Sequence, residues 1–180
     1  MPSIPIILSD RPFFDAPTAI RFQGRHVSVK ADQIIVWVGI IKIRQKYFHP
    51  SHPFFPAILD TGHNHNFSIR EDHLIRWAGL DSRYLDMNRE IRIAGEQLPV
   101  LVADVWLRPN ERGKRDVPAE KMPFCLEIDR GIAVYPKEAP NALRLPLLGL
   151  RALRRAELHL TIDFRRRAVK LRTTRRFWLF

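Results

Sequence analysis

The chain has 180 residues, 46% of them hydrophobic, which is enough for one globular domain with a substantial core. Its formal net charge is +11, and its single cysteine, Cys125, excludes an internal disulfide and fits a reducing compartment. No apolar run approaches the roughly 18 residues that span a bilayer, and the first residues lack a basic leader. We therefore expect one cytoplasmic domain over residues 1–180, with no membrane span.

Strand patterns dominate the first part of the chain. Residues 1–19 contain several prolines and are expected to form an extended N-terminal arm. Alternation of apolar and polar residues then predicts two short strands within 19–30. The β-branched residues of 33–43 predict the strongest strand of the chain.

Residues 56–62, Pro-Ala-Ile-Leu-Asp-Thr-Gly, carry an apolar run directly into an aspartate. A strand is predicted over 66–69. A helix is expected to begin near Ser68, because Ser68-x-x-Glu71 has the pattern of a capping box, and to end at Gly79.

Strands return in the second half. Residues 90–107 predict two strands joined at a hairpin tip around Gly95 and Glu96, and residues 108–123 form an exposed loop without periodicity. The remaining predicted elements are short strands at 124–128 and 132–135, a helix after Gly149, strands at 158–164 and 168–173, and a C-terminal tail at 174–180. The chain is therefore expected to be mainly β, with one or two short α-helices.

Asp60 is poorly placed for the interior of a strand, because a buried charge is costly unless it is paired. One interpretation is a turn aspartate whose carboxylate caps its own backbone. The other is a carboxylate held at the edge of the core for chemistry.

Three features in order support the second interpretation. They are Ile58-Leu59-Asp60-Thr61-Gly62, then the hairpin near 93–100, and then the segment Leu147-Leu148-Gly149, which leads into a helix and two strands. This order resembles the retropepsin-like aspartic proteases, and the tail is similar to that of bacterial single-domain members. The resemblance covers roughly residues 30–173.

The resemblance implies a closed β-barrel and an aspartic endopeptidase that needs no cofactor and no metal. It implies that Asp60 is catalytic, that Thr61 and Gly62 shape the active-site loop, and that Leu147, Leu148 and Gly149 pack beneath that loop. The hairpin residues Ala94, Gly95 and Glu96 would cover a peptide or protein substrate.

The chemistry requires two carboxylates that share one proton, so that one acts as general base on water and the other as general acid. The chain contains only one Asp-Thr-Gly tripeptide. We therefore expect a two-fold homodimer with Asp60 of each copy at the symmetry axis. His63 departs from the family, which usually has a small residue after the tripeptide, and a bulky ionisable group there could perturb the shared proton.

Two other hypotheses remain open. The segment 144–176 carries eleven Lys and Arg against Glu157 and Asp163, so an inactive dimeric binding module could use it to contact nucleic acid or another acidic partner. Solvated helix and strand faces are the favoured explanation of this charge. His63 and His65 could form half of a metal site with His49, His52 or His73, but no further ligands can be assigned.

Overall fold

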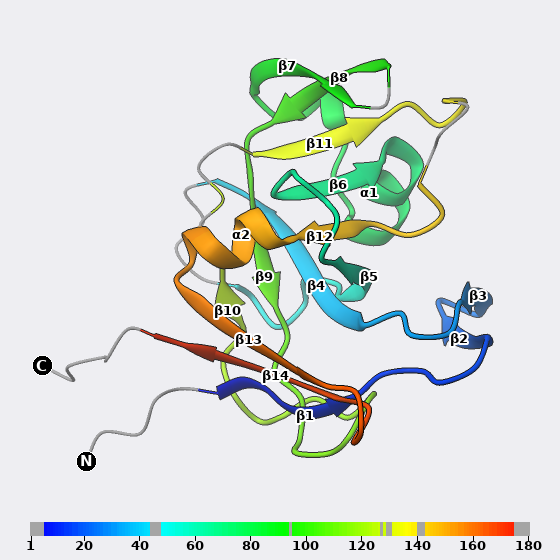
Figure 1. Cartoon of the computed structure of the whole chain (residues 1–180). Coiled ribbons are helices and arrows are strands. Elements are labelled where there is room, and N and C mark those ends of the chain that lie inside the picture. Colours follow the sequence, from blue (N-terminus) through cyan, green and yellow to red (C-terminus); the bar gives the residue numbers. More distant parts are fainter. Residues whose placement is uncertain are drawn as a thin grey trace, which may run out of the picture.

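A computed structural model describes residues 6–43, 48–93, 95–126, 128, 131–139 and 143–174. These residues form three β-sheets, two short α-helices and one turn of 3-10 helix (Figure 1). The expectation of a mainly β chain with two short helices is therefore confirmed. Within these ranges, no helix has the length and apolar character needed to cross a membrane.

The largest sheet has nine strands and contains the Asp-Thr-Gly segment at the end of one of its central strands. Its strands in spatial order are β10 (Phe124–Cys125), β9 (Ala103–Leu107), β4 (Ile35–Lys42), β5 (Phe55–Asp60), β12 (Leu147–Gly149), β6 (Phe67–Arg70), β11 (Ile132–Tyr135), β8 (Glu96–Leu101) and β7 (Met87–Ile93). The apolar run in β4 is buried on both faces of the strand, which explains why it lacks a polar alternation.

A second sheet of three strands lies against the first. Its order is β1 (Ile6–Pro12), β14 (Ala168–Thr173) and β13 (Leu158–Asp163). Leu8 and Val169 are fully buried and belong to the same core as Val36 of the large sheet, so one core joins the two sheets. The predicted arm therefore includes a strand that is hydrogen bonded to β14 of its own chain.

The third sheet is the hairpin of β2 (Thr18–Phe22) and β3 (Arg25–Val29), as the sequence predicted. The prediction of a closed barrel is not confirmed. The nine-stranded sheet begins at β10 and ends at β7, and no strand pairing among the described residues joins its two edges.

The loop at 108–123 covers the outer edge of β1. The Ser9 backbone N–H donates to the Asn110 side chain at 2.9 Å, and the Gly113 N–H donates to the Ser9 carbonyl at 3.0 Å. These contacts occupy polar backbone groups at one edge of the three-stranded sheet.

The helix prediction near residue 68 was wrong about its start. Ser68 belongs to β6, and the N-cap residue Arg70 makes no side-chain capping bond. Instead, the Glu71 carboxylate accepts a hydrogen bond from the Ser82 hydroxyl at 2.7 Å. Gly79 does end this helix, as predicted, with φ 69° in the left-handed region.

The described residues contain two α-helices and one turn of 3-10 helix. They are α1 (Glu71–Ala78), the 3-10 turn η1 (Ser82–Tyr84) and α2 (Leu150–Arg155).

Candidate functional site

Asp60 lies at the end of β5, beside the short strand β12. β12 pairs in parallel with β5 and antiparallel with β6, so it fits between two segments that are consecutive in sequence (Figure 1). In this register Gly149 is the partner of Asp60, and Leu148 is the partner of Leu59. The structure thus brings Asp60 together with the distant segment 147–149, and α2 begins directly after it.

Gly149 has no room for a side chain. A Cβ at this position would lie 2.0 Å from the His65 carbonyl oxygen and 2.5 Å from the His63 carbonyl oxygen. The Gly149 N–H also donates to the Asn66 carbonyl at 3.0 Å. The loop after Asp60 therefore packs directly on the backbone of β12, and only glycine allows this approach.

The Asp60 carboxylate is half-buried and is oriented by its own turn. Its Oδ1 accepts a hydrogen bond from the Gly62 N–H at 2.8 Å. Within the described part of the chain, no hydrogen bond or ion pair to Oδ2 is found. One oxygen is therefore fixed by the backbone, and the other can engage water, substrate or a second carboxylate. A turn aspartate would make the same bond to Gly62, so this contact alone does not distinguish the two interpretations.

Gly62 is less crowded than Gly149. A Cβ at Gly62 would meet only the Asp60 Oδ1, at 3.4 Å, which is ordinary van der Waals contact. The close backbone approach at this site is therefore located at Gly149 and not at Gly62. Thr61, between Asp60 and Gly62, is exposed and lines a groove.

His63 follows the tripeptide and is held by a side-chain contact. Its Nε2 lies 2.9 Å from the Ser68 hydroxyl oxygen. Burial lowers the pKa of His63 to about 4, with a further lowering by His65 that the nearby Asp60 partly opposes. His63 is therefore neutral at mildly acidic pH, and it adds no positive charge beside Asp60 there.

The two histidines of the tripeptide loop do not form a recognisable metal site. The rings of His63 and His65 have centroids 5.6 Å apart. Among the described residues, no group of three or more His, Cys, Asp or Glu side chains is arranged to hold a metal ion. The hypothesis that joins them to His49, His52 or His73 gains no support from the structure.

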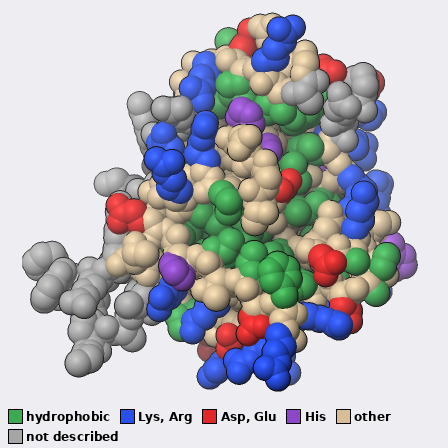
Figure 2. Space-filling view, viewed as in Figure 1, with side chains coloured by type: hydrophobic (Ala, Val, Ile, Leu, Met, Phe, Trp, Pro, Cys, Tyr) green, Lys and Arg blue, Asp and Glu red, His purple; other side chains and the backbone are tan. Residues whose placement is uncertain are grey.

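A groove of about 700 Å³ opens beside Thr61, between α2 and β13. We call it the Thr61 groove. Its walls combine leucine and arginine side chains, and Figure 2 shows Lys and Arg over α2 beside an apolar area of the same face. The residues of α2 and β13 that line it are Leu150, Arg151, Leu153, Arg154, Arg155, Leu158 and Leu160.

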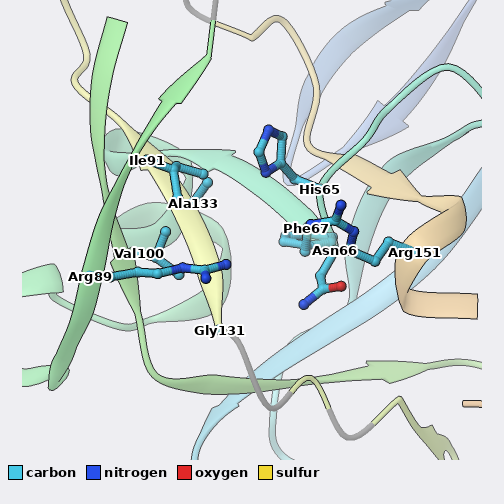
Figure 3. A pocket seen from close by; sticks show the side chains of 9 residues that line it. All are labelled: His65, Asn66, Phe67, Arg89, Ile91, Val100, Gly131, Ala133 and Arg151. Carbon is cyan, nitrogen blue, oxygen red and sulfur yellow. The ribbon is translucent and has the colours of Figure 1, made fainter. Parts of the chain in front are cut away.

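A second, smaller pocket of about 10 Å³ lies on the other side of Arg151, under the β7–β8 hairpin. We call it the Arg89 pocket. Arg89 and Ile91 of β7 line it together with Val100 of β8, opposite residues 65–67, where the loop after Asp60 enters β6 (Figure 3). The open end of the hairpin therefore faces the loop that follows Asp60.

The predicted covering residues are at the tip of this hairpin. Ala94 lies outside the described residues. Gly95 is exposed with φ 89°, and Glu96 pairs with Ile93 beside it. Neither Gly95 nor Glu96 lines the Arg89 pocket, so the hairpin residues nearest the site are ones that the sequence analysis did not name.

Some arginines of the basic C-terminal segment make hydrogen bonds or ion pairs within the chain. Arg144 donates to the Ser28 carbonyl and, at 3.0 Å, to the Gln33 side chain. Arg167 contacts the Asp15 carboxylate. Arg175, Arg176 and the apolar end of the chain lie outside the described residues. These contacts engage Arg144 and Arg167 within the chain, and the interpretation of the segment as solvated helix and strand faces stays a prediction.

Sequence reasoning missed Arg89, Asn66 and Arg151. A single arginine in a strand or a helix looks like an ordinary exposed side chain, and only the folded arrangement brings these three together. No family model matches the chain, and no curated protein or solved structure matches it either.

Proposed function

We propose that the chain is an aspartic endopeptidase with a retropepsin-like protomer, and that it acts as a homodimer. The observation that carries the proposal is the pairing of Asp60 with Gly149, at the point where β5 enters the Asp-Thr-Gly turn. This pairing places the two motifs of the family resemblance side by side. The Oδ1 contact to the Gly62 N–H fixes the orientation of the carboxylate.

The reaction needs a second carboxylate, which the Asp60 of a second copy would supply. Two adjacent carboxylates cannot both ionise easily, so the pair holds one proton. The ionised member takes a proton from water as the water oxygen attacks the scissile carbonyl carbon, and the protonated member donates its proton to the carbonyl oxygen. The carboxyl group that took the water proton then donates it to the amine nitrogen as the carbon–nitrogen bond breaks. The other carboxylate takes a hydroxyl proton from the intermediate, which leaves the carboxylic acid product and restores the pair.

The Thr61 groove supports the placement of the second copy. Thr61 is adjacent to Asp60 and exposed, and four leucines line the same groove. Apolar side chains around an exposed catalytic turn are suited to burial against an identical surface, and a two-fold axis beside Thr61 would bring the two Asp60 residues together. In this proposal the Thr61 groove belongs to the dimer interface.

His63 is compatible with the proposed chemistry. Above its pKa of about 4 it is neutral, so it leaves the shared proton of the carboxylate pair under the control of the two aspartates. Its contact with Ser68 also keeps its Nε2 engaged within the loop.

The test compares wild-type protein with Asp60→Asn in a peptide-library digest at mildly acidic pH. Asparagine keeps an oxygen that can accept the Gly62 N–H, so the variant should fold and dimerise normally while cleavage is lost. Equal cleavage by the two proteins would disprove the assignment. Absence of cleavage in both would favour the alternative, an inactive dimeric binding module.

A further inference from the structure

A groove of about 600 Å³ opens between the β2–β3 hairpin and α1. We call it the Trp77 groove. Figure 1 shows the hairpin and α1 on the same side of the molecule. Clefts that hold small organic ligands have volumes of roughly 300–1,000 Å³, so this groove has the size of a ligand site. It shares no lining residue with the Thr61 groove or the Arg89 pocket, and it is therefore separate from the proposed active site.

One wall of the Trp77 groove is a continuous set of rings. Phe22 meets Trp77 edge-on with ring centroids 5.3 Å apart, and the His73 ring is stacked on Trp77 with centroids 3.7 Å apart. All three residues line the groove together with Val27. Because rings pack well against other rings in edge-on and offset arrangements, this wall is suited to a planar group of a ligand.

His73 brings a buried polar group to this wall. The residue is 8% exposed, and within the described part of the chain neither ring nitrogen has a hydrogen-bond partner. Its Nδ1 is enclosed by protein, so Nε2 is the nitrogen that can meet a molecule in the groove. Burial lowers the pKa of His73 to about 4, which Asp72 opposes and Arg70 and Arg76 reinforce. The ring is therefore neutral near pH 7, and its N–H can donate to a ligand oxygen.

The groove is also strongly basic. Four arginines line it against one carboxylate, that of Asp72. This carboxylate already accepts two hydrogen bonds from Arg70, at 2.8 and 2.7 Å. The lining arginines that form no ion pair with a carboxylate among the described residues are Arg25, Arg76 and Arg144. An anion in the groove would therefore find cations that no acidic side chain has neutralised.

Arg144 is held in place without being neutralised. It donates to the Ser28 carbonyl of β3 and, at 3.0 Å, to the Gln33 side chain, and both acceptors are uncharged. A guanidinium has five N–H groups, so Arg144 keeps its full charge and further donors for a ligand. A cation that is already positioned loses less conformational entropy on binding than a mobile surface arginine does.

We propose that the Trp77 groove binds a small phosphate ester that carries a planar ring, the chemistry of a mononucleotide. The ring packs against Phe22 and Trp77. The phosphate oxygens accept hydrogen bonds from Arg144, Arg76 and His73. A phosphate ester carries about −1.5 to −2 charges near pH 7 and several acceptor oxygens, so it balances the unpaired arginines better than a single carboxylate would.

A strand of nucleic acid also offers rings and phosphates. Proteins bind such strands through a row of cations along the backbone and a series of aromatic platforms for successive bases. The Trp77 groove instead has one aromatic wall and lies between one hairpin and one helix. This arrangement favours a single nucleotide over a strand.

Isothermal titration calorimetry with the whole chain tests the proposal. The probes are adenosine monophosphate, adenosine and inorganic phosphate, which separate the contributions of ring and phosphate. We expect adenosine monophosphate to bind about tenfold more tightly than either fragment, and Arg76→Gln to weaken its binding by about tenfold. Arg76 is exposed, so this change should leave the fold intact. Arg21→Gln is the matched control, because Arg21 is exposed on β2 and does not line the groove.

His73→Phe tests the polar group in the aromatic wall. Phenylalanine keeps a ring against Trp77 and removes both ring nitrogens. We expect adenosine monophosphate to bind about fivefold more weakly, and adenosine to bind as it does to the wild type. The Tm should not fall, because the change removes a buried Nδ1 that has no partner.

Equal affinities for adenosine monophosphate and inorganic phosphate would overturn the inference, because the rings would then contribute nothing. Equal weakening by Arg76→Gln and Arg21→Gln would also overturn it, since general surface charge would explain the binding. Tighter binding of a single-stranded oligonucleotide than of adenosine monophosphate, compared per nucleotide, would assign the groove to nucleic acid instead.

Discussion

Asp60 and Gly149 are paired neighbours on the parallel strands β5 and β12, although about half of the chain separates them in sequence. The loop that follows Asp60 lies against the backbone of Gly149 so closely that no Cβ fits between them. The position of the Asp60 carboxylate is therefore determined jointly by its own turn and by a strand that arrives much later. This dependence leads to the first prediction.

Gly149→Ala should destabilise the protein and displace the Asp60 loop. A Cβ at 2.0 Å from the His65 carbonyl oxygen requires a backbone shift, and overpacking of this kind costs at least about 2 kcal/mol. For a chain of this length, that corresponds to a fall in Tm of roughly 5 °C. Gly62→Ala is the matched control, because its Cβ would meet only the Asp60 Oδ1 at 3.4 Å. Similar Tm values for the two variants would contradict this explanation of Gly149.

His63 should make stability depend on pH in a defined window. Burial lowers its pKa from 6.5 to about 4 in the folded protein. Between these values the unfolded chain binds a proton that the folded chain does not bind, so the free energy of unfolding falls as the pH falls from about 6.5 to 4. Below about pH 4 this contribution levels off.

Urea unfolding of His63→Gln across this window should therefore show a shallower decline than the wild type. Some decline will remain, because burial also lowers the pKa of His73 to about 4. His159→Gln, at an exposed position on β13, controls for the loss of a histidine. Parallel curves for His63→Gln and wild type would show that His63 does not contribute to the pH dependence.

Leu150→Lys should weaken the homodimer without unfolding the protomer. Leu150 is 39% exposed and lines the Thr61 groove, so the change is tolerated in one copy but places two added charges at a shared interface. Like charges brought together cost several kcal/mol, and we expect a dimer dissociation constant about a hundredfold higher. Sedimentation velocity measures it. Met122→Lys, at a 70% exposed loop position, is the control, and an equal effect there would argue against the groove as the interface.

Salt should strengthen the dimer. Arg151 and Arg154 line the Thr61 groove, so association of two copies brings positive charges closer together. Ions screen this repulsion over a Debye length of about 10 Å at 0.1 M. The dissociation constant measured at rising sodium chloride concentration should therefore decrease. An increase with salt would indicate that opposite charges hold the copies together and would place the interface elsewhere.

The sequence predicted elements better than it predicted contacts. Alternation located the β2–β3 and β13–β14 hairpins, because each depends on residues that are close in sequence. Ser68 was misassigned because a capping-box pattern extends over only four residues and takes no account of β11 and β12, which pair with β6 on either side.

The site was predictable only in part. Asp60 stood out because a charge follows an apolar run, and Gly149 was found through the family resemblance. Arg89 and Asn66 carry no pattern in sequence, since their proximity arises from β7 and the loop meeting in the folded chain. The closed barrel was expected from the resemblance alone, and strand pairing among the described residues does not provide it.

The central claim is that one active site is shared by two Asp60 residues, and mixing wild-type and Asp60→Asn protein tests it most directly. After subunit exchange at constant total protein, the cleavage rate is measured against the fraction of wild-type chains. If only dimers with two aspartates are active, the rate will fall as the square of that fraction. A linear decrease would show that each chain acts alone, and would contradict the shared carboxylate pair.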